Sequence, residues 1–210
     1  MDIQEIEQLI RQPQESAKVE FKIQLYKLYE PRPKIKSEEK QWADEKEKQW
    51  AELVKDILSL TNGNIGTANQ TAYLIIGADD KVKPDGTPNI RDIRQVGIKI
   101  PNRKEIYDKV NSYCSPRLPD IECDTFLFEG KQLLVISIPP SPYLHKLSKT
   151  LKTPTGKDKE KHFSTHTVLI RRGDGEEIYE ASQEEQAAIT QEKSEISRSA
   201  TSAFIYGGTF

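Results

Sequence analysis

The stretch Gln14-Glu15-Ser16-Ala17-Lys18-Val19-Glu20-Phe21-Lys22 decides the first strand of the fold. Apolar and polar side chains alternate from Val19 to Gln24, and a period of two predicts a short strand with one apolar face. Glu20 and Lys22 would then stand side by side on an open face, with Glu15 just before the strand. Carboxylates beside a lysine can hold a divalent metal ion and steer a phosphate toward it. A solvated polar face on an edge strand gives the same pattern, so both interpretations stay open.

A second strand is predicted within Thr71-Ala-Tyr-Leu-Ile-Ile-Gly-Ala-Asp-Asp80. Tyr73 to Ile76 form a continuous apolar run, which is typical of a strand covered on both faces. Asp79 and Asp80 follow where this strand leaves the sheet, and strand ends often carry functional side chains. The same two residues could instead open a polar turn, and this alternative stays open.

The remaining pattern mixes helices and strands without a regular β-α-β alternation. Helical spacing of apolar residues predicts helices over 3–10, over 38–60 and from 101 to 113. A hairpin is expected around Glu129-Gly130-Lys131, and a last strand over 167–171. Residues 139–164 read as a long polar insertion with few core residues. The fold class is therefore α+β, with a mixed, mostly antiparallel sheet flanked by helices.

Charge is distributed unevenly along the 210 residues, of which 35% are hydrophobic and 30% charged. The formal net charge of −2 by itself argues against a nucleic-acid-binding protein. From Asp174 onward, however, there are eight acids and two bases, while the preceding part has 29 bases and 25 acids. We predict one domain over residues 1–175 and a polar, acidic helix or disordered arm over 176–210.

The compartment is predicted from what the chain lacks. No run of 18 apolar residues is present, and the first residues have neither a basic leader nor an apolar core. With only Cys114 and Cys123, this indicates a reducing, cytoplasmic setting and no membrane contact. A zinc site built from these cysteines with His162 and His166 is disfavoured, because no Cys-x-x-Cys pair is present.

Five motifs in a fixed order carry a resemblance to a known family. They are Glu-Ser-x-x-x-Glu-Phe-Lys at residues 15–22, Leu-Val-Lys-Asp-Ile-Leu-Ser-Leu-Thr-Asn-Gly at 53–63, Tyr-Leu-Ile-Ile-Gly-Ala-Asp-Asp-Lys at 73–81, Ile-Pro-Pro-Ser-Pro-Tyr at 138–143 and Ile-Arg-Arg-Gly at 170–173. Over about residues 10–182 the chain resembles the Schlafen Alba-like domain family, as a bacterial single-lobe member.

The resemblance implies an activity and a site. Nuclease-active members cleave tRNA and related structured RNA with three acidic residues and a divalent cation. Here those acids match Glu15, Glu20 and Asp80, and the family's lysine matches Lys22. The resemblance therefore implies Mg²⁺ or Mn²⁺ bound by the three carboxylates, which we expect within about 8 Å of each other. The family usually has Asn-Thr-x-Gly-Gly before its buried strand, whereas residues 62–70 are longer and lack the paired glycines.

Basic residues supply candidate contacts to phosphate. The candidate nucleic-acid-binding residues are Lys18, Lys146, Lys149, Lys152, Arg171 and Arg172. The lysine-rich segment could equally be a solvated loop, because acidic residues interrupt it.

Three functions follow as hypotheses. The first is a metal-dependent endoribonuclease or nucleic-acid-processing domain acting on structured RNA, with RNA favoured over DNA. The second is a non-catalytic nucleic-acid-binding or regulatory module, and the third a protein-interaction subunit acting through the acidic arm. No Gly-x-x-x-x-Gly-Lys-[Ser/Thr] motif is present, so no nucleotide cofactor is supported. Family members with two lobes surround RNA with a basic groove, so one lobe implies a homodimer with a shared cleft.

Overall fold

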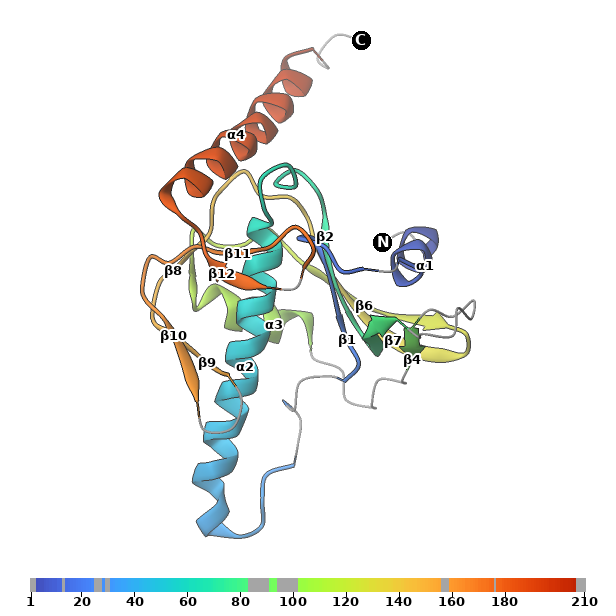
Figure 1. Ribbon diagram of the computed structural model, residues 1–210, viewed down its shortest axis with the longest axis vertical. Coiled ribbons are helices and arrows are strands. Elements are labelled where there is room, and N and C mark those ends of the chain that lie inside the picture. The colour runs from blue at the N-terminus through green and yellow to red at the C-terminus, as the bar shows by residue number, and fades with distance from the viewer. Residues whose placement is uncertain are drawn as a thin grey trace.

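A four-stranded mixed sheet organises the chain (Figure 1). The computed structural model describes residues 3–12, 14–24, 28, 31–82, 91–93, 102–155, 159–175 and 177–206; the side chains of residues 80, 82, 91, 92 and 196–206 are not included. The sheet order is β1 (Val19–Lys22), β2 (Ala72–Ile76), β7 (Lys131–Ile138) and β6 (Glu122–Phe128). β1 runs parallel to β2, and the other two pairings are antiparallel. The predicted α+β class with a mixed, mostly antiparallel sheet is confirmed.

The parallel pair requires a crossover, and helix α2 (Glu39–Asn62) lies within it. A short 3₁₀ turn, Lys36–Glu38, precedes α2. The helix ends at Gly63, whose φ of 69° is a conformation that favours glycine. Helix α1 (Ile3–Ile10) ends before Pro13, and α3 (Arg103–Asn111) begins after an N-cap in which Asn102 Oδ1 accepts the Lys104 N–H. These helices agree with the predicted ones.

Both faces of the sheet are covered, which explains the unbroken apolar run in β2. Leu74 and Ile76 face α2 and α3 in the larger core, where Leu53 and Ile57 also lie. Tyr73 and Ile75 face the other way, into the smaller core that contains α1. Because β2 lies between two apolar layers, it needs apolar residues at every position.

The remaining strands form two-stranded pairs around this sheet. They are β3 (Ala78–Val82) with β4 (Arg91–Ile93), β5 (Cys114–Ser115) with β8 (Lys146–Leu147), β9 (Leu151–Pro154) with β10 (Glu160–Phe163), and β11 (Leu169–Arg171) with β12 (Ile178–Glu180). The predicted polar insertion over 139–164 is therefore wrong. Its charged residues alternate with Leu147, Leu151 and Phe163, which are buried in the larger core.

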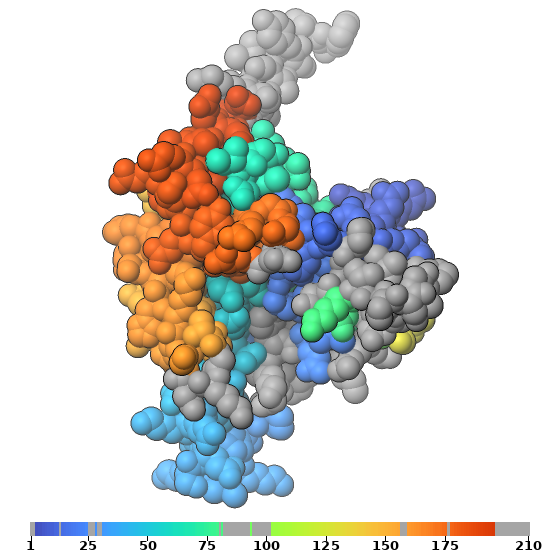
Figure 2. Space-filling view, in the orientation of Figure 1, coloured from blue at the N-terminus to red at the C-terminus, as the bar shows by residue number. Residues whose placement is uncertain are grey.

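The C-terminal segment is largely one helix, α4 (Gln183–Tyr206), which extends away from the sheet (Figure 1). Its first half packs on the domain, because Ile189 is buried with Ala68, Val168 and Ile170. In the space-filling view, the start of α4 lies against the loop that follows α2 (Figure 2). None of the helices in the described part of the chain is both long and apolar enough to span a membrane.

Candidate active-site cleft

A cleft of about 360 Å³ opens between β1, α2 and the β9–β10 and β11–β12 pairs. Charged side chains from separate parts of the sequence line it, namely Glu15, Glu20, Lys22, Lys55, Asp56, Lys161, Arg171 and Glu177. It is the place where most of the predicted catalytic residues meet.

The pairing of β1 with β2 decides where the charged face of β1 points. Glu20 is in register with Leu74, and Lys22 with Ile76, so both point toward α2. Glu20 is only 4% exposed. The predicted open face is therefore wrong, because α2 and β11 cover it and turn it into the floor of the cleft.

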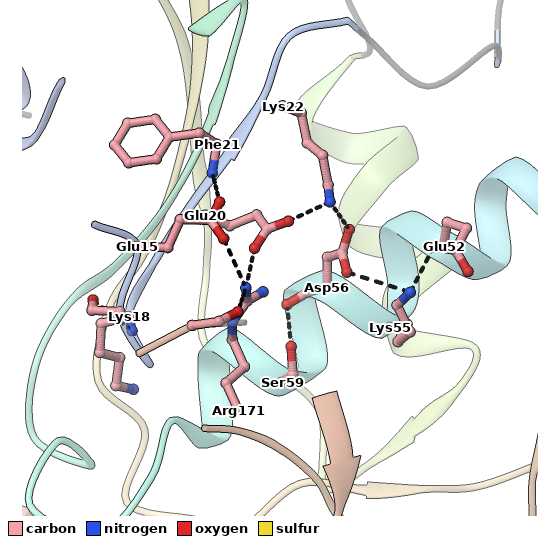
Figure 3. A network of polar contacts seen from close by, with 12 residues as sticks. Glu15, Lys18, Glu20, Phe21, Lys22, Glu52, Lys55, Asp56, Ser59 and Arg171 are labelled. Atoms are coloured by element: carbon pink, nitrogen blue, oxygen red, sulfur yellow. Dashed lines mark hydrogen bonds and ion pairs between the residues drawn. The ribbon is translucent and has the colours of Figure 1, made fainter. Parts of the chain in front are cut away.

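Arg171 at the end of β11 links the two predicted glutamates (Figure 3). Its Nη2 donates to Glu20 and to the carbonyl oxygen of Gly175 at 2.6 Å, and lies 3.8 Å from Glu15 Oε2. The side chain is 2% exposed, and within the described residues its Nε and Nη1 atoms have no hydrogen-bond partner. A buried guanidinium with unused donors is suited to an anionic ligand or a water molecule.

The carboxyl group of Glu15 has a shifted pKa. Its Oε1 accepts a hydrogen bond of 2.7 Å from the Phe21 N–H. Burial, together with the nearby Glu20 carboxylate, raises the pKa of Glu15 to about 7. A carboxyl that titrates near neutrality can accept or donate a proton during a reaction.

Asp56 is a charged residue of the cleft that the sequence reasoning missed. It lies on α2, is 1% exposed, and its Oδ2 is 3.6 Å from Lys22 Nζ (Figure 3). Burial disfavours the Lys22 ammonium, but the Asp56 and Glu20 carboxylates raise its pKa above the ordinary value. The sequence did contain a signal, because Asp56 interrupts an apolar helical stripe between Leu53 and Leu60.

A glycine allows the turn after β11 to approach the cleft. Gly175 has a φ of 82°, and a Cβ atom there would come within 2.6 Å of Glu15 Cβ. Any side chain at this position would push the turn away from Glu15. It would also disturb the hydrogen bond that the Gly175 carbonyl oxygen accepts from the Arg171 guanidinium.

A divalent metal ion would need ligands beyond the carboxylates that the structure describes. Glu15 and Glu20 both face Arg171 Nη2, so these two carboxylates lie close to each other. The backbone of Asp80 lies in β3, but its side chain, and hence the expected 8 Å triangle, falls outside the described residues. Among the residues that are described, no three His, Cys, Asp or Glu side chains are placed to hold a metal. Glu20 is already contacted by Arg171 and Lys22, so the described set alone does not fit Mg²⁺ or Mn²⁺.

The structure separates the predicted phosphate-binding residues. Lys18 is 4% exposed, and its Nζ donates to the carbonyl oxygens of Leu60 and Thr61 at 3.0 and 3.3 Å. Its prediction as a surface phosphate contact is wrong, because it binds the last carbonyls of α2 instead. Arg172 is exposed and pairs with Glu177 at 2.8 Å.

Three further lysines of that prediction lie away from the cleft. Lys146 and Lys152 are exposed on β8 and β9, and Lys149 Nζ lies 3.7 Å from the centre of the Tyr113 ring. None of them lines the cleft, whereas Lys55 and Lys161 do. Whether any of these lysines contacts nucleic acid stays a prediction.

The sequence that forms this cleft matches a known protein family. A family model described as Schlafen, AlbA_2 matches residues 15–180, from the first glutamate of the cleft to the end of β12. The chain belongs to the Schlafen AlbA_2 family. A search of curated protein sequences finds no match.

Two solved structures resemble this Schlafen AlbA_2 domain at low sequence identity. The DIP2311 protein from Corynebacterium diphtheriae is 11% identical over 91% of this chain and 33% of its own, with a TM-score of 0.47. The N-terminal domain of a RecG-related protein from Nitrosomonas europaea is 18% identical over 60% of this chain and 65% of its own, with a TM-score of 0.31. The chain thus spans about a third of the first and under two thirds of the second, and these distant likenesses carry no argument about function.

Proposed function

We propose that the protein is an endoribonuclease or related nucleic-acid-processing domain acting on structured RNA such as tRNA, with the cleft as its active site. The observation that carries this proposal is the convergence of Glu15, Glu20 and Arg171 in one cleft. Membership of the Schlafen AlbA_2 family supports it.

The chemistry can be assigned to side chains that are present. Arg171 and Lys161 supply positive charge for a phosphodiester, and Glu15 supplies a carboxyl whose pKa is about 7. In the proposed step the attacking hydroxyl oxygen bonds to phosphorus while the bond to the leaving 5′ oxygen breaks. Glu15 takes the proton of the attacking hydroxyl, and the leaving oxygen is protonated by water. Because the described carboxylates do not complete a metal site, no step is assigned to Mg²⁺ or Mn²⁺.

A cleavage assay tests the proposal. Purified protein should nick a structured RNA such as tRNA, measured with chelator, with Mg²⁺ and with Mn²⁺ in parallel. Glu15→Gln keeps the size and the Phe21 hydrogen bond but cannot take a proton, so cleavage should fall by about 100-fold or more. Lys161→Ala should weaken RNA binding, whereas Glu5→Gln on the exposed side of α1 should change neither. Equal cleavage by the Glu15 variant would point to a contaminating nuclease.

A second candidate function is a non-catalytic nucleic-acid-binding or regulatory module. One observation favours it: the buried carboxylate of Glu20 is already neutralised by Arg171 and Lys22. A site of balanced charges can bind phosphate without reacting. Tight RNA binding by the wild type, with no cleavage under any metal condition, would select this module.

A further inference from the structure

The C-terminal helix contacts the loop that follows α2, which is the loop without the family's paired glycines. Glu192 on α4 accepts two backbone N–H groups of this loop, at 2.7 Å from Gly66 to Oε1 and at 3.4 Å from Ala68 to Oε2. In Figure 2 this loop and the start of α4 form one continuous surface. A segment expected as a polar arm therefore fixes the backbone of a loop inside the domain.

A buried lysine next to Glu192 fixes the helix itself. Lys193 is 0% exposed, and its Nζ donates to the carbonyl oxygens of Thr61 and Ser141 at 3.3 and 3.2 Å. The Thr61 carbonyl oxygen also accepts a hydrogen bond from the ammonium group of Lys18, a residue that lies two positions before Glu20 in the sequence. Glu192 thus stands at a defined position relative to the end of α2.

The same loop holds the backbone of Arg171. Asn64 Nδ2 donates to the Arg171 carbonyl oxygen at 2.7 Å, and the backbone N–H of Arg171 donates to the Gly63 carbonyl oxygen at 3.4 Å. Asn62, at the start of the loop, donates to the Leu169 carbonyl at 3.0 Å. The end of β11 is thereby attached to the loop on its backbone, while its guanidinium reaches Glu20 in the cleft.

We propose that Glu192, with Lys193 as its anchor, is a positioning residue that sets the place of Arg171 in the cleft through the loop of residues 62–70. The carboxylate ties two N–H groups of this loop together, one from Gly66 and one from Ala68. The assignment of the cleft as an active site rests on the proposed function, but the placement of Arg171 does not.

Hydrogen exchange of the Arg171 Nε–H, followed by NMR, tests the placement without any catalysis. This N–H is buried in the wild type. Glu192→Ala removes the hydrogen bonds from Gly66 and Ala68 to a charged carboxylate, so the loop should hold Arg171 less firmly. The exchange of the Arg171 Nε–H should therefore accelerate about tenfold or more. The exchange of backbone amides in the sheet, such as that of Ile136, should stay within about twofold. Glu184→Ala, at an exposed position of the same helix, should change neither rate.

A double-mutant cycle with Asn64→Ala tests the route through the loop. If Glu192 acts through Asn64, the double variant should exchange no more than about threefold faster than the faster single variant. An unchanged Arg171 rate in Glu192→Ala, an equal acceleration of sheet amides, or fully multiplicative effects would each overturn the proposal. If the wild type does not cleave RNA, the proposed function fails, and the exchange result still decides the positioning role.

Discussion

At the scale of single residues, Glu15 has a protonation state that responds to pH near neutrality. Its pKa of about 7 lies well above the ordinary 4.5, because burial and the Glu20 carboxylate disfavour its charge. Between these two values the folded protein keeps a proton that the unfolded chain releases. Its contribution to stability is therefore fully present below pH 4.5 and is lost as the pH rises through about 7.

Glu15→Gln should remove this pH dependence. The full shift corresponds to about 3 kcal/mol, and partial contact with solvent reduces the expected effect to about 1–2 kcal/mol. Urea unfolding should therefore show the variant equal to the wild type near pH 4.5 and more stable at pH 8. A variant that is less stable at pH 8 would contradict the raised pKa.

Replacing Glu20 should destabilise the protein, in contrast to replacing Glu15. It is buried and contacts two cations, so Glu20→Gln leaves Arg171 and Lys22 without their shared carboxylate. We expect a loss of about 3 kcal/mol in the free energy of unfolding. Combining it with Arg171→Met should cost less than the sum of the two single changes. Strict additivity in that cycle would indicate that the two side chains are not coupled.

At the scale of elements, the C-terminal end of α2 is notable for two buried ammonium groups that meet at one carbonyl. Lys18 and Lys193 both donate to Thr61. Burial, and the Lys193 charge, lower the pKa of Lys18 to about 7; burial lowers the pKa of Lys193 to about 8. The negative charge of Glu192 partly offsets this lowering for both lysines.

The stability of the folded protein should consequently rise with pH in this region. Between about pH 7 and 10.5 the folded state holds fewer protons on these lysines than the unfolded chain does, so the free energy of unfolding increases with pH. Lys193→Met should flatten this rise by about 2 kcal/mol. The difference between wild-type and variant urea midpoints at pH 7, 8.5 and 10 measures it. A difference that is the same at all three pH values would exclude a lowered pKa for Lys193.

Elements fixed by local pattern could be predicted from the sequence, and those fixed by distant partners could not. The run from Tyr73 to Ile76 predicted a strand covered on both faces, and the structure has one. The β9–β10 pair was missed because Leu151 and Phe163 look isolated until α2 is placed beneath them. The same rule holds within the cleft. Glu15 and Glu20 are close in sequence, so their proximity could be predicted. The sequence marks Asp56 only as a polar break in an apolar stripe, and its place beside Lys22 depends on which face of α2 is turned to β1.

At the scale of the whole molecule, a homodimer stays a prediction. Two copies of this Schlafen AlbA_2 lobe related by a two-fold axis would join their clefts into a wider groove for a folded RNA. Light scattering at micromolar concentration should give twice the mass of one chain. RNA binding should weaken steeply as salt is raised, because phosphate contacts release counterions. A clean monomer that binds RNA tightly would contradict the shared groove.

The pairing of Glu20 with Arg171 also has a consequence during synthesis of the protein on the ribosome. The two residues are 151 positions apart in the chain. At 5–20 residues per second, a ribosome would add Arg171 about 8 to 30 seconds after Glu20. Throughout that interval the nascent chain has its first glutamates but lacks the arginine that completes the cleft. For those seconds Glu20 does not have Arg171 to pair with, and the cleft cannot take the form that the proposed function requires.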